Sequence, residues 1–167
     1  MSLELAIQNA ITESASCTRR GDTFNESEEI VNYIKNSSKI IVPNCNDQKV
    51  LAINEVLAEY GLPCANHLDI QTNCCDVSRM PALAKAVMAL DVTNADLIIA
   101  RGRLGVPGSG SMLVIIDYKG RILSAAISPP HHIHGKTVFE AVKEETASAL
   151  KRIGLNRKVS GDNNDGN

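Results

Sequence analysis

Tryptophan is absent from this chain of 167 residues, and only 3% of its residues are aromatic. A platform for single-stranded nucleic acid stacks its bases on several aromatic rings, so we do not expect that function here. The chain also lacks an excess of positive charge, since its net charge is −2 and its sequence pI is about 6.1. It therefore has no general attraction for nucleic acid or for an anionic membrane, and any binding of phosphate must be local.

Long apolar runs are also missing, because none approaches the roughly 18 residues that a membrane span requires. Residues 1–14 include acids but no basic segment ahead of an apolar core, so they are not expected to form a secretory signal. The five cysteines form no CxxC pair, and their odd number argues against a disulfide framework. These absences predict a cytoplasmic protein with reduced thiols and no membrane segment.

What the chain does contain is a 44% share of hydrophobic residues, which is enough for a sizeable core. Strand-like and helix-like patterns alternate along it. We expect strands over residues 39–42, 67–70, 97–100, 112–117 and 121–127. We expect helices that begin near Leu3, at a capping box of Asn25 and Glu28, at Asp47, at Met80 and at a capping box of Thr137 and Glu140.

This alternation predicts an α/β fold in which helices flank a mixed β-sheet. Residues 1–156 are expected to form a single domain, and the polar residues 157–167 a disordered tail. Ligands of open α/β sheets bind at the carboxyl ends of strands, where the N-termini of helices point. Candidate functional residues are therefore expected in the loops that follow strands.

The most informative of these loops is Arg101–Ser111, RGRLGVPGSGS, which lies between two apolar runs. Its glycines leave backbone N–H groups uncovered, so that an anion can approach them closely. Arg101 and Arg103 add planar donors that suit phosphate or carboxylate, and Ser111 adds a hydroxyl. The loop therefore favours a polyanionic ligand, above all a nucleotide, although a flexible surface hairpin would have the same composition.

A second loop, from Pro43 to Lys49, follows an expected strand and precedes an expected helix. Asn44 and Asn46 can contact a base, a sugar or phosphate oxygens, and Lys49 supplies a point charge. Asparagine also favours turns and helix caps whatever the function, so a purely local role stays open.

Three of the four histidines, His131, His132 and His134, lie in the loop before the last expected helix. One of them is a candidate general base or phosphate contact. Lys136 and Thr137 stand at the start of that helix, where phosphate would also bind. The segment is not a P-loop, since that motif requires glycine at position 130, which is proline. A histidine metal site and a rigid structural loop stay open as alternatives.

Two of these loops resemble motifs of the nucleoside-triphosphate pyrophosphatases that hydrolyse inosine and xanthosine triphosphates. That family has a T-x-N-x-x-K loop, which residues 44–49 match with asparagine in place of threonine, and a P-G-x-x-S loop, which residues 107–111 match. The resemblance implies the same fold. It also implies that the contacts of the triphosphate or base include Asn46, Lys49 and Ser111. The acidic pair that holds magnesium in those enzymes is replaced here by Arg101–Arg103, which puts hydrolysis by their route in doubt.

A second resemblance covers roughly residues 3–155 and rests on the strings ADLIIARGRLGVPGSGSMLVIID and SPPHHIHGKT. They are similar to the HcgB-type guanylyltransferases, which act in assembly of the iron-guanylylpyridinol cofactor of the mono-iron hydrogenase in methanogenic archaea. The resemblance implies a homodimer with the pyrophosphatase-like fold. It implies transfer of GMP from GTP to the hydroxyl of a substituted pyridinol, with release of pyrophosphate.

Within that chemistry the loop residues take expected roles. The expected nucleotide contacts are Asn44, Asn46, Lys49, Arg101, Arg103, Ser111 and Thr137. The expected acceptor contacts are Gly105, Val106, Pro107, Gly108, Ser109 and Gly110. The catalytic candidates are His131, His132, His134 and Lys136. Mg²⁺ is expected for any nucleotidyl transfer, and its candidate ligands at strand ends are Asp69, Asp96 and Asp117.

Two other interpretations stay open. A nucleoside-triphosphate pyrophosphatase would hydrolyse free nucleotide without an acceptor. A non-catalytic nucleotide-sensing module would bind the nucleotide and release it unchanged, and the scarcity of paired acids around the glycine-rich loop is compatible with that function.

Overall fold

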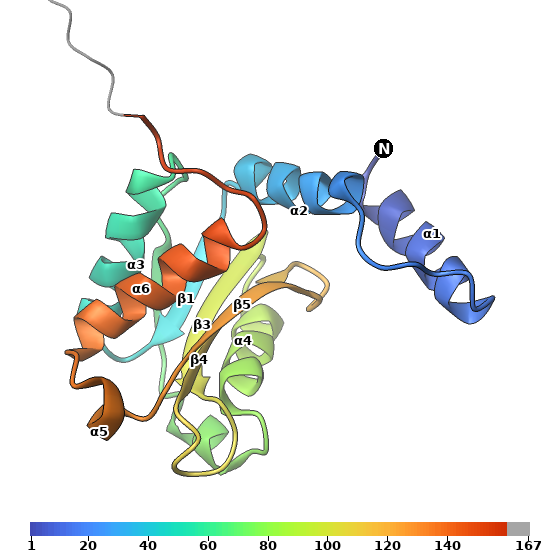
Figure 1. The fold of residues 1–167 in the computed structure, drawn as a ribbon. Helices are drawn as coiled ribbons and strands as arrows, with labels where there is room; N and C mark the ends of the chain where they lie inside the picture. Colours follow the sequence, from blue (N-terminus) through green and yellow to red (C-terminus); the bar gives the residue numbers. More distant parts are fainter. Residues whose placement is uncertain (160–167) are drawn as a thin grey trace, which may run out of the picture.

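The computed structural model describes residues 1–159 and places a five-stranded mixed sheet between helices (Figure 1). The strands are β1 (Ile40–Asn44), β2 (Asn66–Asp69), β3 (Leu97–Arg103), β4 (Ser111–Asp117) and β5 (Ile122–Ser128). The helices are α1 (Leu3–Ala15), α2 (Phe24–Asn36), α3 (Asp47–Glu59), α4 (Pro81–Val92), α5 (His131–His134) and α6 (Val138–Lys151), with a 3-10 turn, η1, at Asn73–Val77. The expected α/β fold with flanking helices is confirmed.

The strand order β2-β1-β3-β4-β5 brings the candidate loops to one edge of the sheet. β1 runs parallel to β2 and β3, whereas β4 runs antiparallel to β3 and β5. The carboxyl ends of β1, β2, β3 and β5 therefore lie at the same edge as the beginning of β4. We call this the loop edge, and its strand-terminal residues are Asn44, Asp69, Arg103, Ser111 and Ser128.

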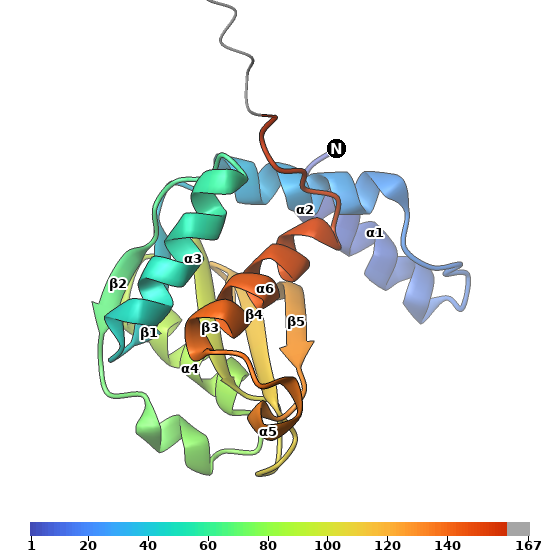
Figure 2. The same cartoon turned by 60° about the vertical axis from the view of Figure 1, so that its left-hand side comes forward.

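Helices cover both faces of the sheet. Figure 2 shows α3 and α6 side by side over one face, with α4 behind the other. Successive residues of a strand point to opposite faces, so Ile99 packs toward α3 and α6 while Ile98 packs toward α4. Because residues 97–100 of β3 and 113–116 of β4 are buried on both faces, each of these segments is a continuous apolar run rather than an alternating one.

The starts of two helices differ from expectation. The capping box of α2 is formed by Thr23 and Glu26 rather than by Asn25 and Glu28: the Thr23 hydroxyl accepts from the Glu26 amide, and the Glu26 carboxylate accepts from the Thr23 amide. Helix α3 is capped by Asn46, one residue before the expected position. The capping box of Thr137 and Glu140 at the start of α6 is confirmed.

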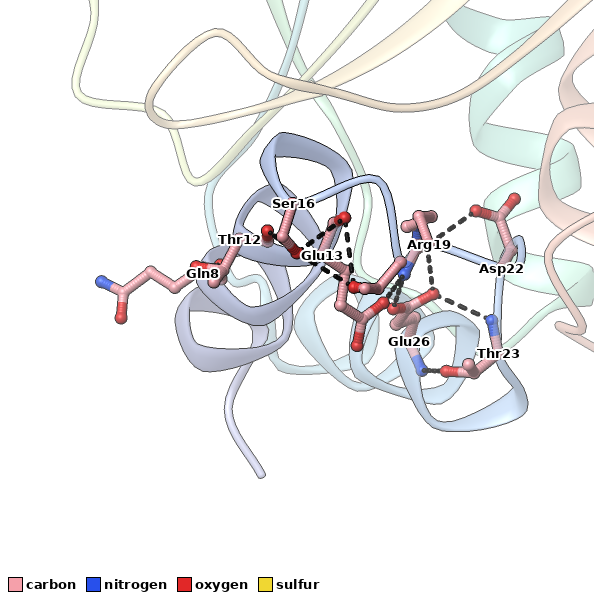
Figure 3. A network of polar contacts seen from close by, with 9 residues as sticks. Gln8, Thr12, Glu13, Ser16, Arg19, Asp22, Thr23 and Glu26 are labelled. Atoms are coloured by element: carbon pink, nitrogen blue, oxygen red, sulfur yellow. Dashed lines mark hydrogen bonds and ion pairs between the residues drawn. The ribbon is translucent and has the colours of Figure 1, made fainter.

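Arg19 ties α1 to α2 through a cluster of carboxylates (Figure 3). Its guanidinium donates to Glu26 at 2.6 and 2.7 Å and to Glu13 and Asp22 at 3.2 Å. The hydrogen bonds that Glu26 accepts from Arg19 and from the Thr23 backbone amide lower the pKa of its carboxyl to about 2. The cluster is partly open to solvent, so its contribution to stability is small.

The chain beyond α6 reaches the C-terminal end of α3. The Lys158 amide donates to the carbonyl oxygen of Glu59 at 2.8 Å, so the first residues of the expected tail are held by a backbone hydrogen bond. Residues 160–167 of that tail lie outside the described residues. Within residues 1–159, no helix combines the length and the apolar character that crossing a membrane requires.

Candidate functional site

A cavity of about 300 Å³ opens at the loop edge, and we call it the strand-end cavity. One wall comes from β3, β4 and the loop between them, and consists of Arg101, Arg103, Gly108, Gly110 and Ser111. The other wall comes from the segment around α5 and the start of α6, and consists of Pro129, Pro130, His131, His134, Val138 and Ala141. Figure 2 shows α5 beside the loop that joins β3 and β4.

Strand pairing explains why these two loops meet. β4 begins at Ser111 and β5 ends at Ser128, and the two residues are partners in the antiparallel register. The glycine-rich loop before β4 and the histidine segment after β5 must therefore leave the sheet next to each other. The structure thus brings together two of the three loops that the sequence singles out.

Arg101 belongs to β3 rather than to a loop, as do Gly102 and Arg103. Its side chain is anchored beneath the strand-end cavity. Nε donates to both carboxylate oxygens of Glu145, at 3.0 and 3.1 Å, and Nη2 donates to the Ser111 hydroxyl at 2.9 Å. Nη1 makes no hydrogen bond to any residue among 1–159, so one edge of the guanidinium remains available to a ligand.

The glycine-rich loop is held by hydrogen bonds within itself and to η1, which disfavours the flexible-hairpin alternative. Arg103 donates from Nε to the Gly105 carbonyl at 2.7 Å and from Nη2 to the Asp76 carbonyl at 2.6 Å. The Gly105 amide donates to the Ser109 hydroxyl at 2.9 Å, and the Ser109 amide donates to the Val106 carbonyl. The amides of Gly105 and Ser109 are thus engaged within the loop, and Gly108 and Gly110 form the part that faces the strand-end cavity.

The histidine segment forms the short helix α5, and its histidines occupy different places. His131 and His134 line the strand-end cavity with their rings 5.1 Å apart and nearly perpendicular. The Lys136 amide donates to Nδ1 of His134 at 2.9 Å, so the neutral ring carries its proton on Nε2 and donates rather than accepts there. His132 is exposed and outside the cavity lining. This arrangement favours His131 as a base.

Lys136 and Thr137 are engaged in local structure. The Lys136 ammonium forms an ion pair with Glu144 of α6. The Thr137 hydroxyl accepts from the Glu140 amide at the start of α6. Neither residue lines the strand-end cavity.

The asparagines of the third loop also carry local hydrogen bonds. The Asn44 side chain accepts from the Asn46 amide at 2.9 Å, and the Asn46 side chain accepts from the Gln48 amide at 3.0 Å. These are the turn and cap contacts that the alternative interpretation of this loop predicts.

Lys49 differs from its neighbours, because it has no ion-pair partner in the part of the chain that the structure describes. It is half-buried in the first turn of α3, where the helix dipole already disfavours a cation. Burial lowers the pKa of the Lys49 ammonium, and so do the charges of Arg101 and Lys85, while Asp76 acts more weakly in the opposite direction. This electrostatic cost would be relieved by a bound anion.

Lys85 and Asp76 form an ion pair whose charges act on Lys49, and the sequence alone did not indicate that either residue belongs to the site. Lys85 is only 9% exposed, on the face of α4 that otherwise carries alanines, and its ammonium lies 3.2 Å from Asp76 of η1. A lysine within a stripe of alanines is the signal that would have identified it.

The structure does not bring the three expected metal ligands together. Asp69 lies at the loop edge, but Asp96 and Asp117 lie at the opposite edge, where β3 begins and β4 ends. The Asp96 carboxylate accepts the Lys39 amide at 2.8 Å, and the buried Asp117 accepts from the Arg121 guanidinium at 2.7 Å. Residues 1–159 contain no cluster of three or more histidine, cysteine or acidic side chains that could hold a metal ion.

These features define an α/β protein with a cationic site at the carboxyl ends of its strands. Residues 3–155 match the model of the family described as FeGP cofactor biosynthesis protein HcgB, guanylyltransferase. Since the match covers most of the chain, the protein belongs to the HcgB family. It is accordingly a guanylyltransferase, and hence a nucleotidyltransferase, of FeGP cofactor biosynthesis, which confirms the family resemblance seen in the sequence.

Proposed function

We propose that this protein transfers GMP from GTP to the hydroxyl of a substituted pyridinol and releases pyrophosphate. Membership of the HcgB family supports guanylyl transfer. The assignment of the two reactants to the site rests on one observation, the arrangement of two cationic side chains and a histidine at the loop edge. Arg101, anchored by Glu145, lines the cavity together with His131, and its charge is one of those that lower the pKa of Lys49, a cation without an anionic partner among residues 1–159.

In this proposal the two parts of the site bind different reactants. The triphosphate contacts Lys49 and the free Nη1 of Arg101, because both are cationic donors with spare capacity. The acceptor occupies the strand-end cavity, whose volume of about 300 Å³ is at the lower end of the range for ligand pockets, roughly 300–1,000 Å³. A single substituted ring fits within that volume.

In this reaction the protein contributes positioning, charge and proton transfer rather than a covalent bond to the substrate. The acceptor oxygen attacks the α-phosphorus, the bond from that phosphorus to the bridging oxygen breaks, and pyrophosphate leaves. Lys49 and Arg101 stabilise the charge on the leaving group. His131 takes the acceptor proton, and His134 orients the acceptor by donating from Nε2. A pyridinol hydroxyl is fairly acidic, so a modest base suffices.

Magnesium accompanies the nucleotide in this proposal. Mg²⁺ in nucleotide sites usually keeps several waters and binds substrate phosphates with one or two carboxylates. Residues 1–159 contain no cluster of metal-binding side chains. The steps described above are therefore assigned to side chains of the protein, and the magnesium is taken to arrive with the nucleotide. Asp69 is the expected metal ligand that lies at the loop edge.

The direct test mixes the protein with GTP, magnesium and a candidate pyridinol. We expect pyrophosphate and a GMP–pyridinol adduct in equal amounts, and tighter binding of GTP than of CTP or UTP. Equal GTP turnover with and without the pyridinol would instead identify a pyrophosphatase, and no turnover in either case would contradict the proposed transfer.

We further propose a cytoplasmic homodimer. The free cysteines among residues 1–159 are compatible with a reducing compartment, and α1 exposes Leu5 and Ile11 where it projects from the sheet. Sedimentation velocity should give about twice the 17.9 kDa mass of the chain. A single species with the mass of one chain would contradict the dimer.

The role of His131 leads to a prediction. His131→Ala should lower turnover by up to about 10²-fold, because a general base is lost for an acceptor hydroxyl that is already acidic, while GTP affinity barely changes. His132→Ala is the matched control, since His132 is exposed and outside the cavity lining, and its turnover should stay at the wild-type rate. Steady-state rates with saturating pyridinol, beside calorimetric titration with GTP, would measure both effects. Equal turnover in the His131 variant and the wild type would rule out this base.

A further inference from the structure

Glu145 is a buried carboxylate beneath the strand-end cavity, and the reaction steps above do not use it. It lies on α6 and is 2% exposed. Both of its oxygens accept from Nε of Arg101, and both lie 3.3–3.4 Å from the Ser111 hydroxyl. Ser111 in turn accepts from Nη2 of Arg101 at 2.9 Å, so the three side chains form a closed network.

Burial makes this network different from the exposed ion pairs of the protein. A buried carboxylate is costly unless a charge partner and further hydrogen bonds compensate for its lost hydration. Here Arg101 supplies the charge and Ser111 supplies the additional donor. The Lys143–Glu55 pair between α6 and α3 is exposed by comparison, with side chains that are 34% and 54% accessible.

The network determines how the arginine can meet a ligand. A free arginine side chain has many rotamers, and ordering them on binding costs entropy. Glu145 and Ser111 engage Nε and Nη2, which leaves Nη1 as the donor that no residue among 1–159 occupies. Because Arg101 also lines the cavity, that donor is already placed before a ligand arrives.

We propose that Glu145 is a positioning residue that acts through Arg101 and holds its guanidinium ready for the phosphates of the nucleotide. This inference rests on the proposed function for the identity of the ligand. It also explains why α6 carries the carboxylate. Ala141, one turn earlier on α6, lines the strand-end cavity, so the contact between Glu145 and Arg101 joins the two walls at their base.

The test is a double-mutant cycle with inorganic pyrophosphate as the probe, measured by calorimetry, beside turnover of GTP with the pyridinol. Glu145→Gln keeps the shape of the side chain and removes its charge. It should weaken pyrophosphate binding and lower turnover by about tenfold to hundredfold. Adding Glu145→Gln to Arg101→Ala should cause no further loss, because Glu145 acts through the arginine. Losses that multiply would overturn the proposal, and so would an unchanged Glu145→Gln variant.

Chemical rescue separates positioning from a merely structural role. Guanidinium ion added to Arg101→Ala should restore part of the turnover, since Glu145 remains to bind it, but should not restore the double variant. Rescue that is equal in both variants would overturn the proposal. If Arg101→Ala does not fold, pyrophosphate binding and turnover of Glu145→Gln beside the wild type still decide the proposal.

Two controls keep the outcomes distinct. Glu55→Gln makes the same chemical change in the exposed Lys143–Glu55 pair and should leave pyrophosphate binding unchanged. A wild-type protein that binds pyrophosphate but forms no adduct would contradict the proposed function, while the binding cycle would still decide the role of Glu145. A wild-type protein that does not bind pyrophosphate would overturn the positioning role itself.

Discussion

Replacing Lys49 with alanine is expected to weaken GTP binding by roughly tenfold to hundredfold, the value of a charge-assisted contact. The same change should leave the protein as stable as before, or more stable. Burial and the charges of Arg101 and Lys85 lower the pKa of Lys49, so its ionised form is less favourable in the folded state than in the unfolded state. Removing the ammonium therefore relieves a cost at neutral pH.

Calorimetric titration with GTP and magnesium, together with thermal unfolding, would measure both effects of Lys49→Ala. Lys151→Ala is the control, because Lys151 is exposed in the last turn of α6. That variant should bind GTP normally and lose a little stability, since a cation at the C-terminus of a helix is favourable. A Lys49 variant that is less stable but binds GTP as the wild type does would assign this residue to packing alone.

Replacing Gly110 with alanine should strongly impair both stability and turnover. Gly110 has φ +88°, and a side chain in this region is strained by roughly 1–2 kcal/mol. An added Cβ would also collide with the Ser128 carbonyl oxygen and lie 3.0 Å from the carbonyl carbon of Pro129. Since these atoms belong to the chain that leads to α5, the collision would push the two walls of the strand-end cavity apart.

Gly108→Ala separates the two causes. Gly108 has φ +96°, but a Cβ there would meet no atom within 4 Å, so this variant carries the backbone strain without the collision. Chemical denaturation should show a loss of stability in both variants that is at least about 1 kcal/mol larger for Gly110→Ala. Turnover should fall further in Gly110→Ala as well. Equal losses in the two variants would show that the loop does not need its close approach to β5.

Much of the fold was predictable because it depends on local patterns. The apolar runs of β3 and β4 indicate strands buried on both faces, and the Thr137–Glu140 box locates the start of α6. The predicted end of β3 was wrong, since the strand continues to Arg103. Composition suggested a loop there, but pairing with β4 supplies hydrogen bonds through Gly102 and Arg103 that no local pattern reveals.

The site was predictable in part. The glycine-rich and histidine-containing segments do meet, and Arg101 lies between them, but the sequence did not show that Glu145 and Ser111 hold its side chain. A signal for Glu145 existed. The capping box sets the helical register of α6, and Glu145 then falls on the face of Ala141, Val142 and Ala149, where an unpaired carboxylate would be costly.

The sequence by itself determined the α/β class, most of the elements and the chemical types that could contact a phosphate, because these follow from periodicity, capping and side-chain chemistry within a few residues. Only the tertiary structure decided which strand ends share an edge. Asp69, Asp96 and Asp117 all stand at strand boundaries, yet β4 reverses direction and β3 begins where β4 ends, so two of them lie far from the loop edge. Strand direction depends on pairing between distant segments, and no local pattern contains it.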